Sequence, residues 1–116
     1  MTWRILVASD GSPPATAALA LALRRFPDAD ITALHVIDPV GGYHRVLAGG
    51  RFEEWHTVAK QRADTILQQA ADQAARDNRS IQVVCETGDT VETIIGYALE
   101  HEFDHIVIGN HGREGV

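Results

Sequence analysis

The chain has 116 residues, enough for one domain with a single hydrophobic core, and 45% of them are hydrophobic. Its net charge of −6, with nine arginines and one lysine, argues against binding to nucleic acids or anionic membranes, because both would repel it. No apolar run reaches the length of a transmembrane helix, the N-terminus lacks a signal-peptide pattern, and one cysteine excludes an internal disulfide framework. We therefore expect a single cytoplasmic domain.

The first half of the chain alternates a strand, a helix and a second strand. Residues 3–8 form a compact apolar run that predicts a strand, and turn-forming residues follow it. Ser12 is placed to cap a helix whose first position is Pro13, and the apolar spacing carries this helix to about Arg25. Residues 31–37 are almost continuously apolar, as expected for a strand with helices on both faces of its sheet.

The middle of the chain is predicted to hold a long loop, a helix and a third strand. Residues 38–50 contain a proline and four glycines and are expected to form the loop. Residues 51–77 carry apolar side chains at helical spacing and are expected to form a helix that ends at Asn78. Residues 81–86 read as the next strand.

The last predicted elements are a helix and a strand. Asp89 and Glu92 are spaced like a capping box, which favours a helix start. Residues 105–109 are a short apolar strand that runs into Gly109 and Gly112. The residues expected on the inner face of the helix are Val91, Ile94, Ile95, Ala98 and Leu99.

This alternation predicts an α/β fold with a doubly wound parallel sheet of order 3-2-1-4. In that order the first and fourth strands are neighbours at the topological switch point, where open α/β sheets bind ligands. Two polar, glycine-containing loops would open there, at residues 8–12 and 109–116. Asp10 offers an acceptor for ribose hydroxyls or a ligand for a phosphate-bound metal. Gly109 and Gly112 permit positive φ and bring backbone N–H groups close to an anion.

Four segments of the chain, in order and at the right spacing, resemble the universal stress protein family. They are residues 5–12 (ILVASDGS), residues 34–38 (LHVID), Gly88 with the helix after it, and residues 104–113 (DHIVIGNHGR). The resemblance spans the whole chain and implies a Rossmann-like fold of the adenine-nucleotide alpha-hydrolase type. It also implies order 3-2-1-4-5 and a homodimer. We expect residues 1–116 to be one such domain, truncated before its final strand.

The resemblance implies ATP as the ligand, with Mg²⁺ as a candidate companion ion. One branch of the family binds ATP through Gly-x-x-Gly, which Gly109 and Gly112 match; a second half of the pattern would fall beyond Val116. The family pattern places Ala8, Ser9 and Asp10 near the adenosine and Val36 beside the adenine. The residues implied along the ribose and phosphates are Ile108, Gly109, His111, Gly112 and Arg113.

Structural alternatives remain open for these residues. The glycines could form a tight turn only, and Asp10 could brace the loop before the helix. His35, within an apolar strand, is expected to be a hydrogen-bonded core residue, and Cys85 a buried apolar one. The histidines show no metal-binding spacing.

We find no catalytic set: no nucleophile elbow and no Walker lysine. A stress-response regulator or sensor that binds an adenine nucleotide is therefore the leading hypothesis. A dimerisation module without a ligand is the alternative, and a slow ATP hydrolase is a third.

Overall fold

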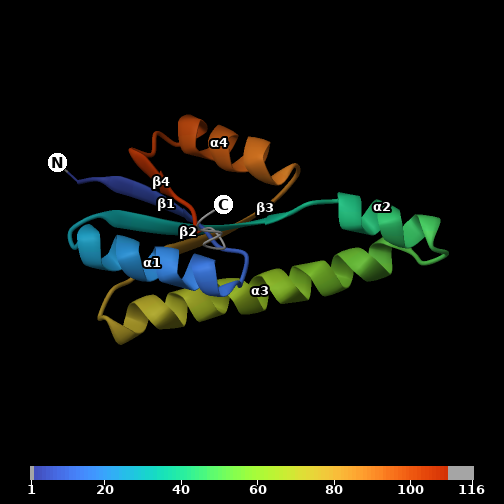
Figure 1. Cartoon of the computed structure of the whole chain (residues 1–116), viewed down its shortest axis with the longest axis horizontal. Helices are drawn as coiled ribbons and strands as arrows, with labels where there is room; N and C mark the ends of the chain where they lie inside the picture. Colours follow the sequence, from blue (N-terminus) through green and yellow to red (C-terminus); the bar gives the residue numbers. More distant parts are fainter. Residues whose placement is uncertain (1, 110–116) are drawn as a thin grey trace, which may run out of the picture.

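The computed structural model describes residues 2–109, which form a parallel four-stranded sheet between helices (Figure 1). The predicted α/β class is confirmed. The elements in chain order are β1 (Arg4–Ala8), α1 (Pro13–Arg25), β2 (Asp30–Ile37), α2 (Val40–Leu47), α3 (Phe52–Arg76), β3 (Gln82–Thr87), α4 (Thr90–Glu100) and β4 (His105–Val107).

The strand order is β3-β2-β1-β4, as predicted. β1 lies in the centre, where Ile5 pairs with Ile31 of β2 on one side and with His105 of β4 on the other. The chain winds outward from β1 to β3 and then returns to the opposite side of β1. The carboxyl ends of β1 and β4 therefore lie side by side at the switch point.

Helices cover both faces of the sheet, with α1 and α3 on one face and α4 on the other (Figure 1). Alternating residues of β1 supply the two cores: Ile5 and Val7 face α1 and α3, whereas Leu6 faces α4. The α1 residues buried in the larger core are Ala18, Leu19, Ala22 and Leu23. Their three- and four-residue spacing is the signal that predicted this helix.

The helix boundaries follow the expected caps. The Ser12 hydroxyl accepts from the amide of Ala15 at 3.3 Å, and the Asp89 carboxylate accepts from the amide of Glu92 at 2.9 Å. Asn78 has φ of 58°, a left-handed conformation that asparagine tolerates better than most residues, and it follows the end of α3. Within residues 2–109, no helix combines the length and the apolar character needed to cross a membrane.

The loop prediction for residues 38–50 is wrong, because most of this segment is the helix α2. Glycine is a poor helix former, but here its missing side chain lets two helices touch. A Cβ on Gly41 would lie 2.8 Å from the Trp55 ring, and one on Gly42 would overlap the ring of Phe52. Tertiary packing against α3 therefore outweighs local propensity. Together α2 and the first half of α3 project beyond the sheet (Figure 1).

The predicted inner face of α4 is only partly correct. Ile94 and Ala98 are buried against the sheet, but Val91, Ile95 and Leu99 are 64%, 48% and 76% exposed. These three residues recur every fourth position and form a stripe of their own. The apolar arc of α4 is wider than the surface that the sheet can cover, so one stripe is buried and the other is left outside.

Candidate functional site

A cavity of about 240 Å³ opens where β1, β2 and β4 end, beside the first turns of α1 and α4. It is the location expected for a ligand in a doubly wound sheet. The residues that line it are Ala8, Ser9, Asp10, Ala15, Leu34, His35, Val36, Thr90, Ile94, Ile108 and Gly109.

The cavity brings together residues that are far apart in the sequence. Six of its lining residues are predicted site residues: Ala8, Ser9, Asp10, Val36, Ile108 and Gly109. The other three predicted residues, His111, Gly112 and Arg113, lie outside the described part of the chain. Sequence reasoning did not assign Ala15, Leu34, Thr90 or Ile94 to the site, because their apolar or capping patterns are explained by helix and strand formation alone.

The loop from β1 to α1 is held by its own side chains. The Asp10 carboxylate accepts from the amide of Ser12 at 2.9 Å, which is the bracing role that the sequence left open. Gly11 has φ of 83°, and a Cβ there would lie 3.0 Å from Ile66 of α3. Only glycine fits that position without strain, so this loop presents Asp10 from a fixed backbone.

His35 connects β2 to the same loop. Its Nδ1 lies 2.7 Å from the carbonyl oxygen of Ser9, and the amide of Ser9 donates to the carbonyl of Leu34 at 2.8 Å. Since a carbonyl can only accept, Nδ1 carries the proton and donates it. The predicted hydrogen-bonded role of His35 is confirmed. Its presence in the cavity was not anticipated, although its position beside Val36 at the carboxyl end of β2 is a signal for it.

A glycine is needed at position 109 because the segment after β4 passes close to the backbone of α1 there. β4 ends at Val107, two residues earlier than predicted, and the chain then passes against the first turn of α1. A Cβ on Gly109 would overlap the carbonyl group of Pro14 and lie 2.9 Å from the amide nitrogen of Ala15. The described glycines with positive φ are Gly11, Gly49 and Gly88. Close approach, and not an unusual φ, therefore explains this glycine.

The cavity has little fixed positive charge. Among its described lining residues, Asp10 and His35 are the titratable ones, and none is Lys or Arg. The first turn of α1 begins with Pro13 and Pro14, which carry no amide hydrogen, so this helix offers few donors to an anion. α4 begins at Thr90 with ordinary amides and a favourable dipole. The described cavity is therefore better suited to an uncharged group than to a triphosphate.

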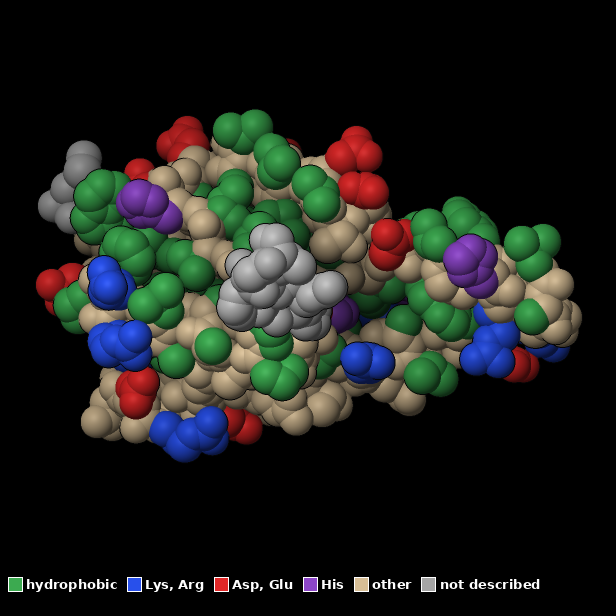
Figure 2. Space-filling view, viewed as in Figure 1, with side chains coloured by type: hydrophobic (Ala, Val, Ile, Leu, Met, Phe, Trp, Pro, Cys, Tyr) green, Lys and Arg blue, Asp and Glu red, His purple; other side chains and the backbone are tan. Residues whose placement is uncertain are grey.

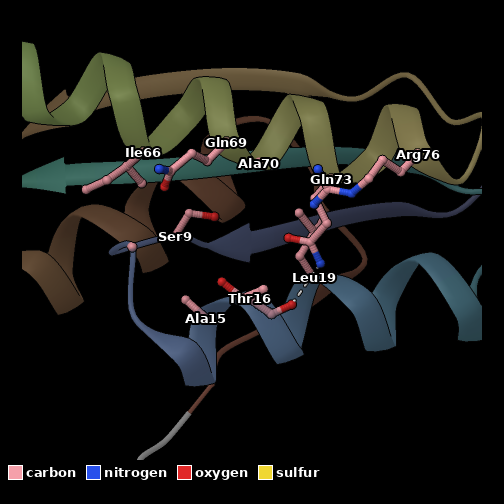
Figure 3. A pocket seen from close by; sticks show the side chains of 10 residues that line it. Ser9, Ala15, Thr16, Leu19, Ile66, Gln69, Ala70, Gln73 and Arg76 are labelled. Carbon is pink, nitrogen blue, oxygen red and sulfur yellow. Dashed lines mark hydrogen bonds between the residues drawn. The ribbon is translucent and has the colours of Figure 1, made fainter.

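A second, smaller cavity of about 160 Å³ lies between α1 and α3, on the face of the sheet that these two helices cover (Figure 3). Its walls include Ser9, Thr16 and Gln73, and the Gln73 amide donates to the Thr16 carbonyl at 3.0 Å. This volume is well below the roughly 300–1,000 Å³ of most small-molecule sites. Within residues 2–109, no three His, Cys, Asp or Glu side chains are grouped to hold a metal ion.

Cys85 is half-buried against the larger core. Burial raises the pKa of its thiol, and the carboxylates of Asp64 and Glu86 act in the same direction while Lys60 opposes them. A thiol that stays protonated is a poor nucleophile, so Cys85 has a packing role, as the sequence predicts.

A doubly wound parallel sheet with helices on both faces defines this chain as a Rossmann-like α/β domain. The sequence profile described as the universal stress protein family matches residues 1–116, so the chain belongs to this family. A search of curated protein sequences found no match.

Solved structures of this family have the same fold. A universal stress family protein from Burkholderia pseudomallei is 25% identical, with a TM-score of 0.77, and the match covers 94% of this chain and 82% of that one. A universal stress protein in complex with cAMP is 20% identical, with a TM-score of 0.66 and coverages of 98% and 77%. An Arabidopsis thaliana family member with AMP bound is 17% identical, with a TM-score of 0.73 and coverages of 98% and 80%.

Proposed function

We propose that this chain binds an adenine nucleotide in the 240 Å³ cavity at the switch point. One observation carries the proposal: three distant segments, residues 8–10, Val36 and residues 108–109, converge on one cavity at the carboxyl ends of neighbouring strands. Two proteins of the same fold, one in complex with cAMP and one with AMP, lend it support.

The nucleoside is the part of the ligand that this cavity suits. Leu34, Val36 and Ile94 provide apolar walls for the adenine ring. Asp10 is exposed and its carboxylate is a strong acceptor for ribose hydroxyls. The volume is below the typical range of about 300–1,000 Å³, so the phosphates extend out of the cavity. In our proposal they pass along the segment that carries His111, Gly112 and Arg113.

ATP is the proposed physiological ligand, with the phosphates and Asp10 as the groups that could share a Mg²⁺ ion. Nucleotide that binds only the folded protein stabilises it by mass action. In the proposed regulatory role, nucleotide binding at the carboxyl ends of β1 and β4 alters homodimerisation or docking to a partner in the cytoplasm. Slow hydrolysis of ATP would be a by-product, since no catalytic set was found in the sequence.

A second candidate function is an interaction module that needs no nucleotide. Two observations favour it. Packing against Pro14 alone accounts for Gly109, and the stripe of Val91, Ile95 and Leu99 on α4 is exposed. An apolar stripe of this kind is typical of a surface that contacts another protein.

Calorimetry distinguishes the two functions. The parent protein is titrated with adenosine, AMP, ATP and cAMP, and the titrations are repeated with Asp10→Asn and Asp28→Asn. Asparagine keeps an oxygen for the Ser12 amide, so the loop stays braced, but the stronger carboxylate acceptor is lost. Asp28 lies in the turn between α1 and β2, at the opposite end of the sheet, and loses the same charge.

Our proposal predicts that Asp10→Asn weakens adenosine binding by about tenfold, the loss of one charge-assisted hydrogen bond. Asp28→Asn should bind like the parent. If the parent binds none of the four ligands, the interaction module becomes the better account.

A further inference from the structure

The projection formed by α2 and the first half of α3 holds a cavity of about 410 Å³ that is separate from the switch point. This volume lies within the range of about 300–1,000 Å³ usual for small-molecule sites. Three arginines line it: Arg45 from α2, Arg51 just before α3, and Arg62 from α3. Glu54 is the one carboxylate among the lining residues. A chain of net charge −6 therefore gathers a local excess of positive charge at this place.

The arginines are largely available to a ligand. Arg51 lies 3.9 Å from Glu54, and both side chains are 75% exposed, so this ion pair is weak. The guanidinium groups of Arg45 and Arg62 have no hydrogen-bond or ion-pair partner among residues 2–109. Guanidinium groups bind phosphate and carboxylate oxygens in pairs, which makes such a group the natural ligand.

Close packing positions the base of the cavity. The Gly50 amide donates to the Arg45 carbonyl at 2.8 Å, and a Cβ on Gly50 would lie 2.6 Å from Cγ of Arg45. The stem of Arg45 therefore rests directly on the glycine backbone. The Trp55 ring packs against Gly41 of α2 by one edge, and it also lines the cavity. Figure 2 shows basic and hydrophobic side chains side by side on this projection.

The apolar part of the cavity comes from helical spacing on α3. Trp55, Val58 and Arg62 are three and four residues apart, so they share one face of the helix. Val58 is 63% exposed, so its side chain is accessible to a ligand in the cavity. The cavity thus places an apolar wall next to its positive charges.

We propose that this cavity is a second binding site, which takes a small organic anion. Arg45, Arg51 and Arg62 hold its phosphate or carboxylate group, and its apolar or aromatic group lies against Trp55 and Val58. The site is independent of the nucleotide cavity, because the two share no lining residue.

The test uses the full chain with Trp3→Phe, so that Trp55 is the one indole. Phenyl phosphate is titrated while Trp55 fluorescence and the NMR signal of its indole N–H are followed. Adenosine, which has no anionic group, is present to occupy the switch-point cavity. Inorganic phosphate and phenol supply the anionic and apolar halves separately, and benzoate distinguishes a carboxylate from a phosphate. The variants are Arg45→Gln and Arg62→Gln, with the exposed Arg24→Gln of α1 as a control of equal charge change.

We expect phenyl phosphate or benzoate to shift the Trp55 signals and to bind more tightly than either half. Each of Arg45→Gln and Arg62→Gln should weaken binding by roughly three- to tenfold, as expected for exposed charged contacts, and Arg24→Gln should not. The proposal is overturned if neither anion moves the Trp55 signals. It is equally overturned if inorganic phosphate binds as well as phenyl phosphate, or if Arg24→Gln weakens binding as much as the cavity variants.

Discussion

Replacing Gly109 with alanine tests the close contact between the chain that follows β4 and the first turn of α1. The new Cβ would lie 2.9 Å from the amide nitrogen of Ala15 and overlap the carbonyl of Pro14, and both neighbours are backbone atoms that cannot rotate away. Such overpacking costs about 1–3 kcal/mol of the free energy of unfolding. Gly109→Ala should therefore destabilise the protein, although alanine normally restricts the unfolded chain and stabilises it.

Gly96→Ala is the matched control. Gly96 lies inside α4, and a Cβ there would meet nothing within 4 Å. Alanine should stabilise this helix by about 0.5–1 kcal/mol, since glycine is the poorer helix former. The two glycine-to-alanine changes thus have opposite predicted signs, and they differ by about 1.5–4 kcal/mol.

Urea unfolding measures both effects. With a slope of about 2 kcal/mol per molar urea, Gly109→Ala should lower the midpoint by roughly 0.5–1.5 M and Gly96→Ala should raise it by about 0.3–0.5 M. Gly109→Ala could instead be as stable as the parent while Gly96→Ala behaves as predicted. The chain after β4 would then not pass close to the first turn of α1, and Gly109 would not form the wall of the switch-point cavity described above.

Three further predictions concern the scaffold. Arg79→Met should lower the free energy of unfolding by about 2–3 kcal/mol, because the guanidinium donates to three carbonyl groups around the end of α1; thermal unfolding checks this, and an unchanged midpoint would contradict it. Leu19→Ala should cost about 2–5 kcal/mol, since Leu19 is 1% exposed in the core; a loss below 1 kcal/mol in urea unfolding would argue against the packing described. Cys85 should react slowly with iodoacetamide until the pH exceeds the ordinary thiol pKa, because burial raises its pKa. The unfolded thiol then loses its proton first, so stability should fall as the pH rises through that range, and less so in Cys85→Ala.

Strand order was predictable because its signals are local. Apolar runs separated by caps such as Ser12 and Asp89 fix the elements, and the rule of right-handed crossovers limits how they assemble. The neighbouring positions of Ala8, Asp10 and Ile108 follow from that order alone, which is why the sequence could group them. The resemblance to the family added Val36, whose hydrophobicity says nothing about a ligand.

The features that were missed depend on contacts between distant residues. Gly41 and Gly42 suggested a loop, since their packing on Phe52 and Trp55 is visible only in three dimensions. Without α2, no sequence argument could bring Arg45 next to Arg62. The local sequence pattern also does not reveal which of the two apolar stripes on α4 faces the sheet. Nor does it reveal whether a glycine is required by a positive φ or by the close approach of another segment.

The central claim is that the carboxyl ends of β1 and β4 form a site for an adenine nucleotide, and an NMR titration tests this claim most directly. The ¹⁵N-labelled chain is titrated with adenosine, which has no anionic group for the arginine-lined cavity, and amide shifts are mapped onto the sheet. We predict saturable shifts confined to residues around the cavity, with Asp10, Val36 and Gly109 among the largest, and little change in the projection around Trp55. The absence of saturable shifts, or shifts centred away from the carboxyl ends of β1 and β4, would contradict the account.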